Sequence, residues 1–589
     1  MIIAPSGSQS AFLRKDRLIK AGLFILVLWL ASVLRWYRLS ETVLAGFDVW
    51  TYLRLVFEWT THGMRPEGAF AKPGFIMLGV GAGKLLGVSD ATLPFLNASL
   101  DVINVALVFG LARLAGLAFA PAVTAMCLYA CLPAAVLEAR SALTHIASLT
   151  FVLAAVSLLL LRHRLPLSRI ACRYTLVFAA SLMAGYAGLT HPTALLWPLL
   201  LPVLLVILHR KTLRQPWPLV EELLLYAAGV TTPFFAFALG VKSETLYGYK
   251  LLALWRSIFQ HGQDAAYMKA GFEISLGKID HYLGQMFFAH IITPPLVWLF
   301  ALASAWAVMT ATRLYRCGLH QRAIIFALYS DPPALVGLTT LGVLVLGLLI
   351  ARLNGFEQWF MGDRFFLTLA PVAIMLGVAM LEAPARLLSN SWHNSIMIGV
   401  CLVGLAGFWH YFPQYLYTNP PFYKQLRKIS RQQDIVVDAK DKVLVFPDAG
   451  RHPLTSDYYF SRQDFLTDAH PQNSADLTRF LATNHIRYIL FSPVVYLGLT
   501  SQEGHPAVLA ANDPKVREDL RHQIAFFQNY LEERQASPRL CFKQSWPPQD
   551  TDLRPVRLYA IGNHDYTAHL GNSRGRDNAF CLFDLEAKP

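Results

Sequence analysis

An isolated carboxylate between aromatic residues is the most conspicuous chemical feature of the first hundred residues. Asp48 lies in the sequence Phe47-Asp48-Val49-Trp50, shortly after an apolar segment that ends near residue 37. Desolvation by aromatic neighbours disfavours the charged form of a carboxylate and makes it a better base near neutral pH. Asp48 is therefore a candidate general base, with a helix cap or an ion pair to a nearby arginine as the structural alternatives.

Basic side chains near the ends of apolar segments are candidates for binding an anionic group. Lys72 stands next to Pro73, at the end of a segment that combines basic, acidic and aromatic residues, so it is one candidate residue of a site there. Arginines at a membrane boundary also extend to lipid headgroups, so a structural role stays open for them. The other basic candidates are Arg35, Arg38, Arg140 and Arg364, and the other candidate substrate contacts are Tyr52, Glu58, Glu138 and His191.

The composition predicts a polytopic α-helical membrane protein. Of the 589 residues, 55% are hydrophobic and 15% are charged, and the mean hydropathy is +0.40. Residues 18–37 form an apolar run of bilayer-spanning length with no small-residue cleavage site after it, which predicts an uncleaved first helix. About eleven spans are expected, at residues 18–37, 92–113, 117–137, 145–161, 174–190, 192–209, 219–240, 288–311, 333–351, 365–381 and 395–412.

The distribution of charge predicts the topology and argues against a nucleic-acid partner. The formal net charge is +13, yet residues 413–589 hold 21 Lys and Arg against 20 Asp and Glu, so the excess lies in the membrane part. The sequence therefore lacks a basic tail for nucleic acid. Loops on the side of the N-terminus hold 16 basic against 5 acidic residues, and cytoplasmic loops carry such an excess, so a cytoplasmic N-terminus is expected.

With an odd number of spans, three long pieces are expected on the extracytoplasmic side: the loops 38–91 and 241–287 and the segment 413–589. The aromatic loop 241–287 is predicted to lie in the membrane interface, with closure over a substrate as the functional alternative.

The composition of 413–589 predicts a soluble α/β domain. Its two cysteines, Cys541 and Cys581, are able to pair in an oxidising compartment. Expected strands are 442–446, 488–491 and 556–560, and expected helices are 474–485 and 512–535.

Two further patterns have structural explanations. Asn97, Asp101 and Asn104 form one polar stripe at helical spacing, for which interhelical hydrogen bonding is favoured over a functional site. The glycine-rich run that ends at Lys84 superficially matches a phosphate loop, but no Ser or Thr follows the lysine, so nucleotide-sugar use is not expected.

No zinc signature is present. A divalent metal stays open as a cofactor, with Glu58 as one candidate ligand.

The N-terminal motifs resemble those of bacterial GT-C membrane glycosyltransferases, in the group of the protein mannosyltransferases and the aminoarabinose transferase of lipid A. In that group an arginine-rich helix end is followed by an acidic motif in the first outer loop and then by a Lys-Pro or His-Pro pair. Val49 stands where the group usually has a second carboxylate. The matching residues are Arg35, Arg38, Asp48, Tyr52, His62-Gly63, Lys72-Pro73, Glu138-Ala139-Arg140, Leu189-Thr190-His191-Pro192 and Asp363-Arg364-Phe365-Phe366.

The resemblance implies that residues 1–412 form a transmembrane, inverting glycosyltransferase domain in the inner membrane. Enzymes of this group move a sugar from a polyprenyl-phosphate carrier to a lipid, glycan or protein acceptor on the outer side. The resemblance assigns the role of general base to Asp48. It assigns contact with the donor phosphate to Lys72, Arg364 and Arg140.

Two other classes of protein stay open. A transporter or flippase of lipid-linked saccharides usually has repeated halves and polar residues at the bilayer midplane, whereas the polar candidates here gather at the outer edge. A non-catalytic scaffold with an outer binding domain would leave Asp48 and Lys72 unexplained. The catalytic subunit of oligosaccharyltransferase is not expected, because its Trp-Trp-Asp-Tyr-Gly motif is absent from residues 413–589.

Overall fold

The chain forms two compact units, Met1–Ser40 with Leu55–Pro413 and Glu41–Arg54 with Gln414–Pro589. Several expected features lie outside the described residues: the loop 241–287, the spans 288–311 and 333–351, and the candidates Arg38 and Arg364. A computed structural model describes residues 7–37, 39, 47–63, 72–165, 170–209, 217–238, 367, 370–385, 390–416, 442–446, 473–483, 486–491, 526, 529–530, 533, 538–544 and 578–584.

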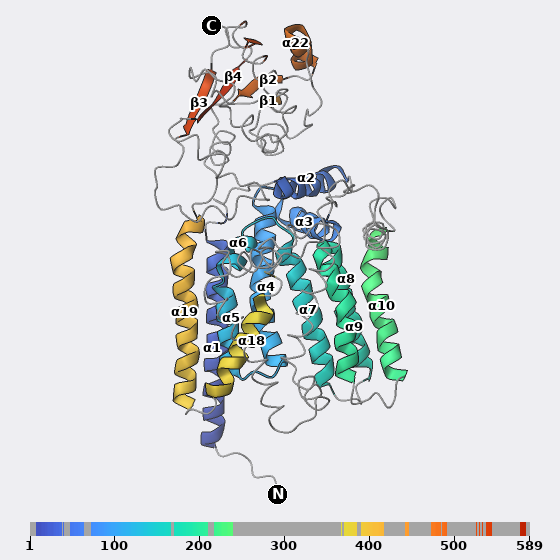
Figure 1. The fold of residues 1–589 in the computed structure, drawn as a ribbon, viewed down its shortest axis with the longest axis vertical. Coiled ribbons are helices and arrows are strands. Elements are labelled where there is room, and N and C mark those ends of the chain that lie inside the picture. The colour runs from blue at the N-terminus through green and yellow to red at the C-terminus, as the bar shows by residue number, and fades with distance from the viewer. Residues whose placement is uncertain are drawn as a thin grey trace, which may run out of the picture. The chain divides into compact units, whose positions relative to one another are not determined.

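The first unit is a bundle of apolar helices, as the composition predicts (Figure 1). Within the described residues, five helices are long and apolar enough to cross a membrane: Arg17–Trp36, Thr92–Leu114, His145–Arg164, Ile170–Thr190 and Trp217–Phe237. Its elements are α1 (Gly7–Trp36), α4 (Thr92–Leu114), α5 (Phe119–Ala130), α6 (Pro133–Ala139), α7 (His145–Arg164), α8 (Ile170–Thr190), η2 (Pro192–Leu195), α9 (Leu196–His209), α10 (Trp217–Ala238), α18 (Ala370–Ala385) and α19 (Asn390–Leu416).

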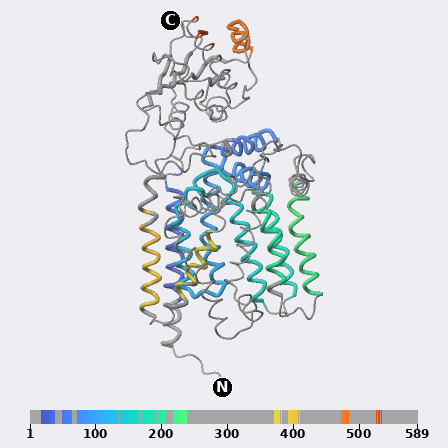
Figure 2. The backbone as a smooth tube through the Cα atoms, viewed as in Figure 1, coloured from blue at the N-terminus to red at the C-terminus, as the bar shows by residue number. Residues whose placement is uncertain are grey.

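Helix α4 occupies a central position in this unit, because it packs against α1, α5, α6 and α7. Its C-terminal turn is closed by Gly116, whose φ of 103° lies in the region that favours glycine. Helices α7, α8 and α10 follow as neighbours (Figure 2). Gly185 and Gly229 allow α8 and α10 to approach closely, since a Cβ at either position would overlap the facing helix.

The span expected at 117–137 is not one helix. The structure has α5 and α6, with Cys131 and Leu132 between them. Pro133 explains the break, because proline is tolerated in the first turn of a helix and disrupts the interior of one. The prediction of one continuous helix over residues 117–137 is therefore wrong.

The segment 38–91, expected as an outer loop, contains two helices. Helix α2 is Phe47–His62 and helix α3 is Pro73–Leu86. Pro73 occupies the first turn of α3, and Gly87 ends the helix with φ 79°. With 14 residues, α3 is too short to cross a bilayer of ordinary thickness. Helix α3 packs against α4 and α8.

A buried charge cluster joins three helices at the end of the bundle opposite to the C-terminus of α1. Arg162 of α7 donates two hydrogen bonds to Oε1 of Glu222 on α10, one of them from Nε at 3.1 Å. Arg173 of α8 reaches the same oxygen at 3.2 Å. All three side chains are buried. The cluster ties the α7–α8 hairpin to α10.

The second unit contains a four-stranded sheet in the order β1-β2-β4-β3. Strands β1 and β2 are parallel, β2 and β4 are antiparallel, and β4 and β3 are antiparallel. The strands are β1 (Lys442–Phe446), β2 (Ile486–Phe491), β3 (Pro538–Gln544) and β4 (Asn578–Asp584), with α22 (Ser474–Thr483) packed against β2. The expected strand at 556–560 and most of the expected helix at 512–535 lie outside the described residues.

The register of β3 and β4 supports a disulfide between the two cysteines of the second unit. Cys541 and Cys581 are Cα partners in this antiparallel ladder. Such partners have Cα atoms about 4.5 to 5.5 Å apart, which is within the range that a disulfide accepts. In protein taken from an oxidising compartment, alkylation should label five of the seven cysteines before reduction and all seven after it. Labelling of all seven cysteines without reduction would contradict this pairing.

Candidate active site

The candidate base lies at the start of α2. Asp48 is the second residue of this helix, and Tyr52 and Glu58 follow it on the same helix. Tyr52 is buried and Glu58 is partly exposed. The dipole of a helix favours a carboxylate in the first turn, so the helix-cap alternative for Asp48 remains beside the catalytic one.

Two sequence motifs that are far apart along the chain meet at the N-terminus of α3. The carbonyl oxygen of Gly74 accepts a hydrogen bond from Tyr186 Oη at 2.9 Å. A Cβ at Gly74 would lie 2.7 Å from Thr190 Oγ1 and 2.8 Å from Thr190 N, so only glycine allows this approach. Lys72 is the N-cap residue of α3, and His191 directly follows Thr190. The structure thus brings the Lys-Pro-Gly and Thr-His-Pro motifs together.

A second histidine accompanies His191. The ring centroids of His145 and His191 are 4.6 Å apart, and both side chains are buried. His145 is the first residue of α7, and His191 follows the last residue of α8. The sequence interpretation missed His145. The available signal was an ionisable residue at the end of an apolar segment, which is a functional candidate by default.

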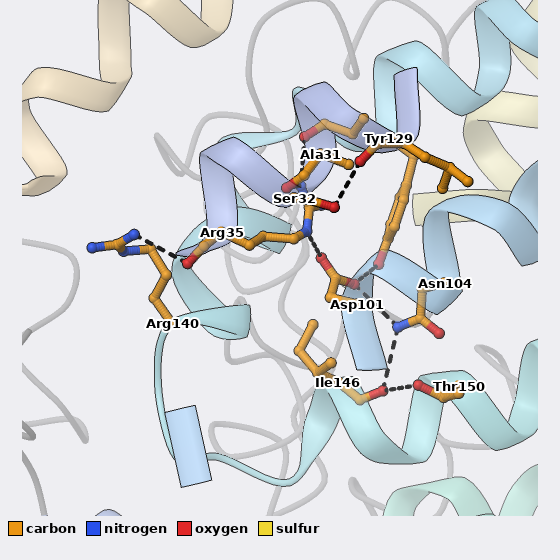
Figure 3. Close-up of polar contacts among 11 residues, drawn as sticks. Ala31, Ser32, Arg35, Asp101, Asn104, Tyr129, Arg140, Ile146 and Thr150 are labelled. Atoms are coloured by element: carbon orange, nitrogen blue, oxygen red, sulfur yellow. Dashed lines mark hydrogen bonds and ion pairs between the residues drawn. The ribbon is translucent and has the colours of Figure 1, made fainter. Parts of the chain in front are cut away.

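The arginine at the end of α1 is part of a buried polar network (Figure 3). Arg35 Nε donates to Asp101 Oδ2 at 2.7 Å, and both side chains are fully buried. Tyr129 Oη donates to Asp101 Oδ1 at 2.6 Å, and Asn104 Nδ2 donates to the same oxygen at 3.1 Å. Asp101 therefore joins α1, α4 and α5. This confirms the hydrogen-bonding interpretation of the Asn97–Asp101–Asn104 stripe.

Two arginines each bind the end of another helix. Arg35 Nη1 donates to the carbonyl of Ala130, the last residue of α5, at 2.9 Å. Arg140, which follows α6, donates through Nη1 to the carbonyls of Arg35 at 3.1 Å and Tyr37 at 2.7 Å, at the end of α1. The last carbonyls of a helix have no partner within the helix, and cations there are stabilising. These contacts fix the point from which the chain leaves α1 (Figure 3).

The short segment after α6 is held by α4. Asn97 Nδ2 donates to the carbonyls of Ser141 at 2.9 Å and Leu143 at 2.6 Å. The Ser141 hydroxyl contacts the carboxylate of Glu138 at 3.2 Å, and Glu138 is buried. Thus Glu138 lies in the same framework as Arg140.

The described candidates fall into three groups. Asp48, Tyr52 and Glu58 lie on α2. Lys72 and His191 adjoin the contact between Gly74 and Thr190 at the N-terminus of α3, whereas Arg35, Arg140 and Glu138 belong to the network around the end of α1. Burial lowers the pKa of the Arg140 guanidinium, which remains protonated at neutral pH because the ordinary value is very high. Among the residues that the structure describes, no group of three or more His, Cys, Asp or Glu side chains is placed to hold a metal ion.

Comparison with known proteins finds solved structures with a similar fold but no relative by sequence. No family model and no curated protein matches the chain. Among solved structures, the oligosaccharyltransferase of Archaeoglobus fulgidus in complex with Zn and sulfate has a TM-score of 0.51 at 14% identity, over 89% of this chain and 72% of that one.

A second solved structure is ArnT from Cupriavidus metallidurans bound to undecaprenyl phosphate. It has a TM-score of 0.42 at 15% identity, over 82% of this chain and 94% of that one. Both neighbours are GT-C membrane glycosyltransferases. The apolar helices, together with the likeness to the oligosaccharyltransferase, indicate a multi-pass membrane protein with the GT-C fold.

Proposed function

We propose that the protein is an integral-membrane glycosyltransferase that moves a sugar from a polyprenyl-phosphate carrier to an extracytoplasmic acceptor. The observation that carries the proposal is the meeting of Lys72-Pro73-Gly74 with Thr190-His191 on a GT-C fold. Both motifs belong to the sequence resemblance, and they contain Lys72, a predicted phosphate contact, and His191, a predicted substrate contact. Their contact supports one shared role and leaves the acceptor, whether lipid, glycan or protein, unassigned.

In the proposed reaction a single displacement inverts the anomeric carbon. A bond forms between that carbon and the acceptor oxygen or nitrogen, while the bond to the carrier phosphate oxygen breaks and its electron pair stays on the phosphate. Asp48 takes the proton of the acceptor. One carboxylate is enough, in contrast to the two that glycoside hydrolysis requires. This assignment needs no second carboxylate at Val49.

Cations stabilise the leaving phosphate in this proposal. Lys72 at the start of α3 and Arg364 are assigned to it, and charge-assisted contacts of this kind are stronger than neutral hydrogen bonds. Arg140 stays a predicted phosphate contact, although two backbone carbonyls already accept from its guanidinium. Arg35 and Arg38, with Tyr52, Glu58, Glu138 and His191, stay predicted substrate contacts. No step is routed through a metal ion.

The experiment that tests the proposal uses purified protein in liposomes that contain a polyprenyl-phosphate sugar. Transfer of the sugar to an added acceptor extract, with release of the polyprenyl phosphate, is the expected result. Movement of the intact donor to the opposite leaflet without release of carrier would instead identify a flippase. Neither transfer nor movement would favour a scaffold.

Lys72→Ala is expected to lower kcat/KM for the donor about 10- to 100-fold, because a hydrogen bond to a charged group contributes about 1.5–3 kcal/mol. The matched control is Lys84→Ala, since Lys84 is an exposed lysine in the last turn of the same helix. The measurement is the initial transfer rate as the donor concentration is varied. Equal donor dependence in the two variants would assign Lys72 to the structure of α3.

A further inference from the structure

The glycine-rich run of α3 is the place where α2 crosses this helix. A Cβ at Gly79 would lie 2.5 Å from Val56 Cγ2, and a Cβ at Gly83 would lie 3.4 Å from Thr60 Oγ1 and 3.7 Å from Val56 Cγ1. Gly79 and Gly83 are one helical turn apart, as are Val56 and Thr60, so each pair shares a face of its helix. Val56 is fully buried. We call Gly79 and Gly83 the α3 seat.

Steric contact with neighbouring residues explains why these two positions of α3 are glycine. Gly81, between the two, has no atom within 4 Å of a Cβ built there, whereas a Cβ at Gly79 would overlap Val56 of α2. A Cβ at Gly83 would overlap Val88, which follows α3, at 2.8 Å, and would meet α2 at ordinary contact distance. Glycine destabilises a helix interior relative to alanine, so a tight contact is needed to explain it. Small residues let two helix backbones approach closely in this way.

Helix α3 is itself fixed to the bundle. At its N-terminus Gly74 lies against Thr190 and receives the hydrogen bond of Tyr186. At its middle, a Cβ at Gly79 would also lie 2.8 Å from Leu93 Cδ2 of α4. The seat is therefore a rigid support for α2.

We propose that Gly79 and Gly83 are positioning residues, which seat α2, the helix on which Asp48 lies, through Val56 and Thr60. This inference rests on the proposed function. Asp48 precedes Val56 by eight residues on α2, and Lys72 precedes Gly79 by seven residues at the start of α3. Each distance is about two helical turns, or roughly 12 Å along the axis. A shift at the crossing is carried along a stiff helix to the base, and misplacement by about 1 Å can cost a factor of about 100 in rate.

A cross-link tests the seat without any assay of activity. A Cβ at Gly79 would lie 3.7 Å from Val56 Cβ, and disulfides join Cβ atoms that are about 3.5–4.5 Å apart. In full-length protein with Val56→Cys and Gly79→Cys, oxidation with iodine should yield a linked peptide pair by mass analysis. The control, Val56→Cys with Gly81→Cys, should yield none. Failure of the first pair to cross-link, or equal linking of both pairs, would overturn the seat.

Kinetics test the positioning role. Gly79→Ala should lower kcat about 10- to 100-fold per folded molecule, with KM for polyprenyl-phosphate sugar within about two-fold of the wild type. Gly81→Ala should leave both parameters near the wild type. Adding Val56→Ala to Gly79→Ala removes the facing methyl groups of α2 and should restore part of kcat, since the overlap with Leu93 of α4 remains. A purely structural role would lower the yield of folded protein and leave its turnover unchanged, which would overturn the inference.

The cross-linked pair separates this inference from the proposed function. Sugar transfer by the double-cysteine variant that is as fast after cross-linking as in its reduced form is the expected result, because the bond locks the arrangement that the variant already has. Loss of transfer on cross-linking, restored by reduction, would mean that the seat must open, and the inference would be wrong. If the wild type transfers no sugar while the cross-link forms, the proposed function fails and the positioning role with it, but the seat stands.

Discussion

Asp48→Asn is expected to lower the turnover number for sugar transfer by about 10²- to 10⁴-fold, the range that general base catalysis contributes. Asparagine has the shape of aspartate but cannot take the proton of the acceptor. Loss of the negative charge from the first turn of α2 costs about 0.3–1 kcal/mol, so the helix should still form. The measurement is the transfer rate at saturating donor, with the amount of folded protein determined for each variant.

The matched control for this variant is Glu58→Gln, which neutralises a partly exposed carboxylate further along the same helix. Because Glu58 is a predicted substrate contact and not the base, this variant should lose at most about 10-fold in rate, the loss expected for one hydrogen bond. If Asp48→Asn loses no more than this, Asp48 is a residue of the helix start and another group is the base. If both variants lose activity equally, the cause is the charge of α2 and not a base at Asp48.

Asp101→Asn is expected to destabilise the first unit by about 3–5 kcal/mol, because it leaves the guanidinium of Arg35 buried without a counter-charge. Asparagine keeps only one acceptor oxygen, so either Arg35 or the pair Tyr129 and Asn104 then faces an NH2 group in place of an acceptor. The measurement is thermal unfolding of the detergent-solubilised protein. A midpoint equal to that of the wild type would contradict this role of the network.

The companion variant replaces both charges, Arg35→Met with Asp101→Leu. Exchange of a buried ion pair for apolar residues of similar volume is often neutral or stabilising, so the double variant should recover most of the lost stability. If the double variant is as unstable as the single one, Arg35 and Asp101 stabilise the first unit through directed hydrogen bonds that apolar side chains cannot replace. The hydrogen bond from Arg35 to Ala130 is one such contribution.

The helices of the membrane unit were predictable because spanning length and apolarity are local properties. Helix α7 begins at His145 and α8 ends at Thr190, both at the expected positions. The break at Pro133 was predictable in principle, since proline signals a boundary. Helices α2 and α3 were missed because polar and aromatic residues within α2 hide its periodicity, and because α3 is shorter than a span.

The contacts of the candidate residues were not predictable, because they join segments far apart in the chain. The sequence marks Asp101 as an intramembrane carboxylate, but only the fold shows that Arg35, 66 residues away, is its partner. Likewise, Gly74 and Thr190 meet only because α3 lies on the end of α8. The glycine-rich run Gly79–Gly83, which superficially matches a phosphate loop, lies inside α3, and its contact with α2 is visible only in the fold.

The most direct test of the central claim is mass analysis of surface glycolipids and glycoproteins from cells that contain the wild type, the Asp48→Asn variant, or no protein. The account predicts that one glycan or lipid species carries an added sugar with the wild type. It predicts that the same species lacks this sugar both with the variant and without the protein. Identical surface profiles in all three cells would contradict the assignment of the protein as a glycosyltransferase.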